Sequence, residues 1–125
     1  MNLHVRPVKQ LSGRVAVPGD KSITHRALLL GGLGEGDSRI DSFLDSGDCR
    51  ATVGCMEGLG IAIERPAADA LVVHGRGLHG WHPPQRALDC IRSGTTMRLM
   101  AGLLAGQPFD STLTAEAQLL ARPMD

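Results

Sequence analysis

Residues 18–30 read PGDKSITHRALLL, a tight turn followed directly by an apolar helix. The proline and the glycine end the preceding segment, and the apolar run predicts a helix over residues 22–32. Either Asp20 or Ser22 can cap the free N–H groups of its first turn. The stretch therefore marks one helix start, from which the other elements can be traced.

Two cations and two hydroxyls lie at this helix start. Lys21 and Arg26 add positive charge to the helix dipole, and Ser22 shares a face with Arg26 because the two are four residues apart. Lysine and arginine form strong charge-assisted hydrogen bonds with phosphate. The pattern indicates a phosphate-binding helix start; the alternative is a solvated helix with ordinary surface charges.

A second helix start lies 72 residues further on, the distance from Arg26 to Arg98. There the run Ser-Gly-Thr-Thr at 93–96 takes the place of the lysine and the serine. Its glycine, Gly94, permits close backbone approach to a ligand, and the threonines supply hydroxyls. The same offset matches Thr24 with Thr96 and Gly34 with Gly106. The chain is therefore predicted to repeat one structural unit.

The composition is that of an ordinary globular chain, with 125 residues, 42% hydrophobic and 21% charged. It predicts one domain or part of a larger one. Thirteen basic residues balance thirteen acidic ones, which argues against nucleic acid as a partner and against a polybasic membrane anchor. The sequence contains neither a signal peptide nor an apolar run long enough to span a membrane, so a cytoplasmic protein is expected.

The remaining periodicities predict an α/β (α+β) fold with helices packed on a mixed sheet. Strands are expected over 3–8, 13–17, 38–43, 61–64, 70–74 and 109–114, and further helices over 49–59, 94–104 and 116–122. Ser46 or Asp48 would cap the helix over 49–59. Pro66 would form the turn between the two strands on either side of it.

The spacing of the cysteines and histidines gives little indication of a metal site. The cysteines, at 49, 55 and 90, lack C-x-x-C spacing and are predicted to be buried free thiols. The histidines at 74, 79 and 82 lie among glycines and prolines, without regular spacing or a nearby carboxylate. They are predicted to be exposed loop residues and not metal ligands.

Four motifs occur in order along the chain: PGDKSITHRALLL at 18–30, LDSGDCRAT at 44–52, SGTTMRL at 93–99 and ARPMD at 121–125. Through them the chain resembles the 5-enolpyruvylshikimate-3-phosphate synthase family over nearly its whole length. The related UDP-N-acetylglucosamine enolpyruvyl transferases have Lys-Asn where this chain has Lys21 and Ser22, so they are the weaker match.

The resemblance implies a transferase, 3-phosphoshikimate 1-carboxyvinyltransferase, of the shikimate pathway to chorismate and the aromatic amino acids. It would transfer the carboxyvinyl group of phosphoenolpyruvate to the 5-hydroxyl of shikimate 3-phosphate and release phosphate. No metal and no organic cofactor are expected. The partners implied are the two anionic small-molecule substrates.

The resemblance also assigns roles to residues. Lys21, Ser22 and Arg26 match contacts to shikimate 3-phosphate. Lys21, Gly94 and Arg122 match contacts to phosphoenolpyruvate. Lys21, the one candidate catalytic residue here, would stabilise charge and move a proton.

Three further residues are possible supporting contacts in this assignment. Thr95 and Arg98 lie near the second helix start, one turn apart. Arg92 stands where the family usually has asparagine, so it either adds a cation to the phosphoenolpyruvate site or blocks it. The segment 114–117, Thr-Ala-Glu-Ala, also departs from the common Gly-Asp pair, so the loop before Arg122 is expected to differ in shape.

No carboxylate in the chain matches a general base of the family. Asp45 and Asp48 are interpreted as helix-capping residues. The acidic groups that the reaction needs lie later in a full family member, so the rest of the enzyme is an expected partner.

The fold implied by the resemblance is two domains built from repeated βαβαββ units, with one unit and part of a second present here. Residues 1–12 would form a strand region belonging to the other domain, and residues 13–125 would form part of the N-terminal substrate-binding domain. We therefore expect an N-terminal portion of the enzyme that does not turn over alone. The alternative is an isolated, non-catalytic anion-binding module or fragment.

Overall fold

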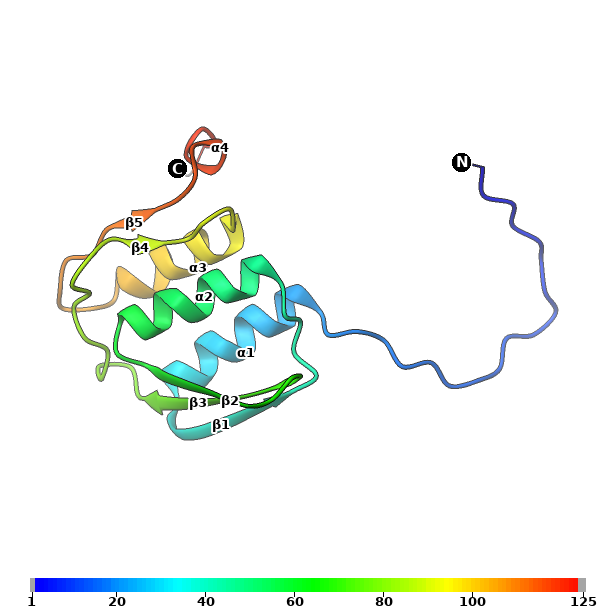
Figure 1. The fold of residues 1–125 in the computed structure, drawn as a ribbon, viewed down its shortest axis with the longest axis horizontal. Helices are drawn as coiled ribbons and strands as arrows, with labels where there is room; N and C mark the ends of the chain where they lie inside the picture. Colours follow the sequence, from blue (N-terminus) through cyan, green and yellow to red (C-terminus); the bar gives the residue numbers. More distant parts are fainter. Residues whose placement is uncertain (1, 124–125) are drawn as a thin grey trace.

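The computed structural model describes residues 2–123, in which helices and short strands alternate (Figure 1). The helices are α1 (Lys21–Leu33), α2 (Gly47–Gly58), α3 (Gly94–Leu104) and α4 (Ala117–Leu120). The strands are β1 (Glu35–Asp41), β2 (Ala62–Ala67), β3 (Ala70–Arg76), β4 (Leu88–Asp89) and β5 (Leu113–Thr114). The order α1-β1-α2-β2-β3 is the expected unit without its first strand, and β4-α3-β5-α4 begins the next copy.

The strands form a three-stranded antiparallel sheet and a separate parallel pair. In the sheet β3 lies between β1 and β2, and β1 pairs with β3 from Glu35 opposite Arg76 to Asp41 opposite Ala70. Strand β4 runs parallel to β5. Antiparallel and parallel pairs are therefore both present, in two sheets and not in one.

The helices cover one face of the sheet. Figure 1 shows α1 and α2 next to the strands and α3 on the side of α2 away from them. Their facing sides bury the apolar core, whose side chains each contribute about 1.5–3 kcal/mol. Fully buried members include Leu28, Met56, Leu59, Ile61, Val73, Met100 and Leu119. The alternation of helix and strand with a shared core confirms the predicted fold class.

The end of α1 lies unusually close to β3, at Gly75. A Cβ added there would fall against the carbonyl oxygens of Gly31 and Gly34, nearer than real Cβ atoms approach backbone. The Gly77 N–H also donates to Gly34 O (2.8 Å). A residue without a side chain is therefore required where the helix meets the sheet.

The predicted repeat is visible in the helices. Shifting α1 by 72 residues places it over 93–105, and α3 spans Gly94–Leu104. The matched threonines, Thr24 and Thr96, are both buried. The helix predicted over 94–104 is confirmed, and the first predicted helix is confirmed to within one residue at each end.

Two predicted strands are wrong. Residues 3–8 and 13–17 form no strand in the structure and lie on an exposed arm that leads away from the sheet (Figure 1). Val15 and Val17 alternate as in a strand, yet they are 83% and 79% exposed. Alternation creates a strand only where another strand offers hydrogen-bond partners, and none lies beside this arm among the described residues.

Other strand boundaries differ from the predicted ones, because a strand ends where its hydrogen-bonded pairing with a neighbour ends and not where its amino-acid composition changes. The first strand of the sheet is Glu35–Asp41, earlier than the predicted 38–43, and only Leu113–Thr114 of the predicted 109–114 is paired. Pro66 lies inside β2 and not in the turn, at a point where the register with β3 shifts. The last helix is shorter than predicted, at Ala117–Leu120.

The described helices are also short. The longest, α1, has 13 residues. Within residues 2–123 no helix combines the length and the apolar character that crossing a membrane requires.

Candidate functional site

The N-termini of α1, α2 and α3 lie at the same end of the molecule (Figure 1). Two contacts join them: the Lys21 ammonium donates to Asp48 Oδ2 (2.9 Å), and the Thr96 hydroxyl lies 3.3 Å from Asp48 O. Each helix start carries roughly half a positive charge from its aligned peptide dipoles. Three of them side by side make this end of the molecule suited to anions.

The start of α1 is capped by Asp20. The Ile23 N–H donates to Asp20 Oδ1 (2.8 Å), and the Thr24 hydroxyl donates to Asp20 O (2.8 Å). Of the two capping residues considered from the sequence, the structure uses Asp20. Ser22 is exposed and its hydroxyl takes no part in the cap.

Lys21 is held over the start of α2 by its ion pair with Asp48. About half of the lysine side chain (47%) remains exposed, so the ammonium stays accessible to a ligand. The hydrogen bond and the charge of Asp48 raise the pKa of Lys21 above its ordinary value. Lys21 is therefore a fixed, protonated cation at physiological pH.

Arg26 lies one turn beyond Ser22 on the same face of α1. Its guanidinium donates to Ser22 O (3.1 Å), and both residues are exposed. The structure thus brings Lys21, Ser22 and Arg26 together in the first two turns of one helix, as predicted. A hydroxyl and two cations on one helix start can bind phosphate oxygens by charge-assisted hydrogen bonds.

The start of α3 is capped by Ser93, whose Oγ accepts the Thr96 N–H (3.1 Å). Gly94 and Thr95 follow and are half-buried. A Cβ at Gly94 would meet only Leu119 Cδ1, at 3.4 Å, so the protein itself leaves room there. The free N–H groups of this turn are available to a ligand.

The predicted arginines near α3 are placed around α4. Arg98 donates to Pro123 O (2.8 Å), and Arg92 pairs with Glu116 (3.5 Å). Arg122 is exposed, and its backbone N–H donates to Leu119 O (3.0 Å). The Leu119 side chain is the one that a Cβ at Gly94 would meet. The α4 segment that precedes Arg122 thus lies beside the α3 start through Leu119, whereas the side chains of Arg92 and Arg98 are bonded to Glu116 and Pro123 O.

Asp48 was misinterpreted from the sequence. It does not cap α2, because Ser46 Oγ accepts the Cys49 N–H (3.2 Å) and fills that role. Asp45 is not a cap either, since its carboxylate accepts from Arg50 (2.6 Å) and Arg65 (2.8 Å). No local signal distinguishes a capping aspartate from one that reaches a lysine 27 residues away.

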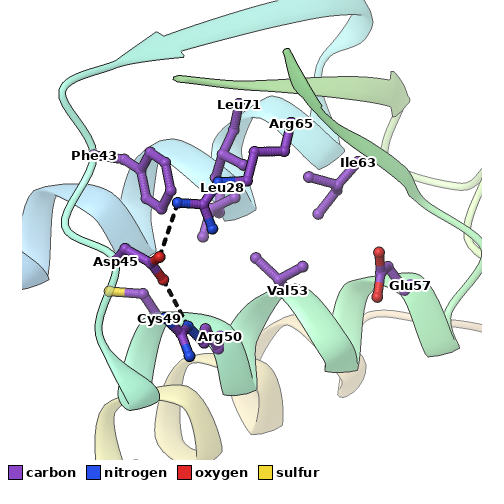
Figure 2. A pocket seen from close by; sticks show the side chains of 10 residues that line it. All are labelled: Leu28, Phe43, Asp45, Cys49, Arg50, Val53, Glu57, Ile63, Arg65 and Leu71. Carbon is purple, nitrogen blue, oxygen red and sulfur yellow. Dashed lines mark hydrogen bonds and ion pairs between the residues drawn. The ribbon is translucent and has the colours of Figure 1, made fainter. Parts of the chain in front are cut away.

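A cavity of about 200 Å³ lies between α2 and the sheet (Figure 2). Figure 2 shows its apolar lining and the aspartate at its rim, joined to two arginines. Those hydrogen bonds, from Arg50 first and then Arg65, lower the pKa of Asp45 to about 2. Within the described residues no helix N-terminus converges with another at this cavity, whereas three do around Lys21, so the helix starts and not the cavity are the candidate anion site.

The predictions for cysteine and histidine had different outcomes. All three cysteines are buried and free, as predicted. His74, in contrast, lies on β3 with Nδ1 2.7 Å from Asp37 and Nε2 3.3 Å from Glu64, so the expectation of no nearby carboxylate was wrong. The carboxylates come from neighbouring strands, which spacing cannot reveal. Among residues 2–123, no group of three or more potential ligand side chains is arranged to hold a metal ion.

Comparisons with known proteins show which family this chain is similar to. A family model described as EPSP synthase (3-phosphoshikimate 1-carboxyvinyltransferase) matches residues 5–125. Two proteins named 3-phosphoshikimate 1-carboxyvinyltransferase, from Alkalilimnicola ehrlichii and Legionella pneumophila (strain Paris), are 52% and 48% identical to this chain over 124 residues, 99% of its length. The chain spans only 28% and 29% of their lengths. The solved EPSP synthase from Acinetobacter baumannii superposes with a TM-score of 0.85 at 42% identity, over 90% of this chain and 26% of that structure.

Proposed function

Because the chain belongs to the EPSP synthase family, we propose that it supplies part of the substrate site of a 3-phosphoshikimate 1-carboxyvinyltransferase. The observation that carries the proposal is the convergence of three helix starts around Lys21. In the reaction, the 5-hydroxyl oxygen of shikimate 3-phosphate bonds to C2 of phosphoenolpyruvate, and the bond from C2 to the phosphate oxygen breaks. The 5-hydroxyl gives up its proton and C3 gains one as the bond to C2 forms; C3 loses a proton as the bond to phosphate breaks, and inorganic phosphate is released.

Shikimate 3-phosphate is assigned to the start of α1. Ser22 would donate a hydrogen bond and Arg26 would add a planar fork of donors to phosphate or carboxylate oxygens. To do so the Arg26 guanidinium exchanges its bond to Ser22 O, a weak surface contact, for a charged oxygen. Lys21 would lie between the two substrates and assist proton movement.

Phosphoenolpyruvate is assigned to the start of α3. Gly94 would offer its N–H, and Arg122 would contribute a guanidinium from the segment after α4. Thr95 would support these contacts with its hydroxyl. Arg92 and Arg98 can join only by releasing Glu116 and Pro123 O, so we assign them secondary roles.

The remainder of a full-length family member completes this proposal. The chain spans 28–29% of the relatives' length, and among the described residues the carboxylate beside Lys21, Asp48, is engaged in an ion pair. We propose that the acid–base groups and the other substrate contacts come from outside the chain, which then does not turn over alone. Cytoplasmic location and the absence of a nucleic-acid partner stay predictions from the sequence.

A chimera tests the proposal. The 125 residues would replace the matching segment of the Alkalilimnicola ehrlichii relative, which is 52% identical, and phosphate release would be measured with both substrates. We expect activity in the chimera and its loss in a chimera carrying Lys21→Met. Lys9→Met is the matched control, because Lys9 is the only other lysine and is exposed on the arm.

An active chimera that tolerates Lys21→Met as well as Lys9→Met would contradict the assigned role of Lys21. A folded but inactive chimera would favour the alternative, a non-catalytic anion-binding module. That alternative predicts substrate binding by the chain without turnover in any combination.

A further inference from the structure

Three polar side chains are completely buried between the helices behind the candidate site. They are His25 on α1, Thr52 on α2 and Thr96 on α3, each with 0% exposure. Burying such groups costs free energy unless they form hydrogen bonds. Each of the three helices contributes one of these side chains where the helices meet, so the side chains need to form hydrogen bonds with one another.

The three side chains form a continuous hydrogen-bonded chain. His25 Nδ1 lies 2.7 Å from Thr52 Oγ1, which lies 2.8 Å from Thr96 Oγ1. Thr96 Oγ1 in turn lies 2.7 Å from Ser93 Oγ, the cap of α3. This hydrogen-bonded chain of side chains thus runs from the second turn of α1 to Ser93, the residue that precedes Gly94.

The donor-to-acceptor direction of this hydrogen-bonded chain follows from the protonation of His25. His25 Nε2 is buried and has no hydrogen-bond partner in the described part of the chain. A buried N–H without a partner is rarer than a buried acceptor without one, so Nε2 is assigned as unprotonated. His25 Nδ1–H then donates to Thr52, Thr52 donates to Thr96, and Thr96 donates onward to Ser93 Oγ or Asp48 O.

Burial also keeps the imidazole neutral. Desolvation lowers the pKa of His25; Lys21 and Arg26 lower it further, and Asp48 opposes them. A neutral ring with a single N–H supports only one direction of the chain at a time.

We propose that the chain formed by His25, Thr52 and Thr96 sets the position of the α1 start relative to the α3 start. His25 lies one turn from Lys21, and Thr96 lies two residues from Gly94, so the chain joins the two assigned substrate contacts through their own helices. Thr52 is the positioning residue at its centre. The consequence for ligands rests on the proposed function; the consequence for helix geometry does not.

The test replaces the central hydroxyl. Thr52→Val keeps the shape of the side chain and removes both hydrogen bonds, Thr52→Ser keeps the hydroxyl, and Thr112→Val is the control at an exposed threonine. Residual dipolar couplings of the backbone amides of α1 and α3 report the angle between the two helices. We expect the angle to change in Thr52→Val and to stay at the wild-type value in Thr52→Ser and Thr112→Val.

Binding gives the second readout. The affinity for shikimate 3-phosphate should fall about tenfold in Thr52→Val, which corresponds to the loss of one hydrogen bond to the ligand. It should recover in Thr52→Ser. An unchanged helix angle in Thr52→Val, or an equal change in Thr52→Ser, would overturn the inference. If Thr52→Val shows the expected change of angle but the wild type binds no shikimate 3-phosphate, the proposed function fails and the positioning role stands.

A measurement on the wild type keeps the inference testable if Thr52→Val does not fold. A long-range ¹H–¹⁵N spectrum of the imidazoles distinguishes a protonated Nδ1 from a protonated Nε2. We expect His25 to carry its proton on Nδ1. A proton on Nε2 would overturn the assigned direction, and an Nδ1 whose ¹⁵N shift shows no hydrogen bond would overturn the chain through which Thr52 is proposed to position the helices.

Discussion

At the scale of single residues, Lys21 shows what sequence reasoning can and cannot supply. Its place at a capped helix start follows from the turn before it and the apolar run after it, because both signals are local. Its partner, Asp48, lies 27 residues away on another helix. An aspartate near a helix start fits the capping preference equally well, so only the packing of α1 against α2 reveals the ion pair.

Asp48→Asn tests that ion pair. The substitution removes the charge and the strongest acceptor of the Lys21 ammonium, so the pKa of Lys21 should fall back toward its ordinary value of 10.5. The ¹³Cε shift of Lys21, followed as the pH is raised, measures it. Asp110→Asn, at an exposed aspartate, should leave the titration unchanged. The same titration in Asp48→Asn as in the wild type would show that the pair does not form.

Gly75→Ala tests the close approach of α1 to β3. The added Cβ meets two backbone carbonyls that cannot rotate away, so the free energy of unfolding should fall by about 1–3 kcal/mol, the usual range for overpacking. Gly54→Ala is the matched control, because no atom lies within 4 Å of its added Cβ on α2. It should stabilise the chain by about 0.5–1 kcal/mol. Urea denaturation measures both; equal effects would show that Gly75 is not under steric constraint.

At the scale of elements, helices were predicted better than strands. The helix over 94–104 matches α3 residue for residue, because capping residues and apolar spacing act within the helix itself. The strands expected over 3–8 and 13–17 do not form, because a strand depends on a neighbour that its own sequence does not contain. The 72-residue repeat located the helix starts of α1 and α3 but not the third, at α2.

His74→Gln tests how the three strands of the sheet are joined. His74 on β3 lies between Asp37 on β1 and Glu64 on β2, and the hydrogen bond to Asp37 raises its pKa above 6.5. A raised folded-state pKa stabilises the fold below the unfolded value, and this contribution is lost as the pH rises through the folded value. The wild type should therefore exceed His74→Gln in unfolding free energy at acidic pH, and the difference should vanish at alkaline pH.

Urea denaturation across this pH range provides the measurement. His79→Gln, at an exposed histidine outside the strands, reports the background. A difference between wild type and His74→Gln that stays constant with pH would mean that the imidazole does not bind its proton more tightly in the folded state.

At the scale of the whole molecule, three helices that start at one end turn dispersed residues into one candidate site. Lys21, Ser22, Arg26 and Gly94 could be predicted from the sequence because each lies in a readable helix start. The structure added Asp48 and the buried chain through Thr52, which exist only once the helices pack. The polypeptide covers 28–29% of its relatives' length, and we propose that the rest of the site lies beyond it.

Deleting the arm tests the boundary of the folded body. Residues 2–18 are exposed, so removing the chain up to Leu11 should change the unfolding free energy by no more than about 0.5 kcal/mol. Asp20→Ala, which removes the cap of α1, should cost about 1 kcal/mol. Chemical denaturation of both variants gives the comparison. A deletion that costs as much as the cap would show that the arm packs on the body.

The most direct test of the central claim is a ¹H–¹⁵N correlation spectrum of the chain titrated with shikimate 3-phosphate. If the helix starts form a substrate half-site, the largest shift changes occur at the amides of Lys21, Ser22 and Arg26 and are lost in Lys21→Ala. Lys9→Ala should respond like the wild type. A dispersed spectrum that does not respond to the ligand, or that responds equally in Lys21→Ala, would contradict the claim.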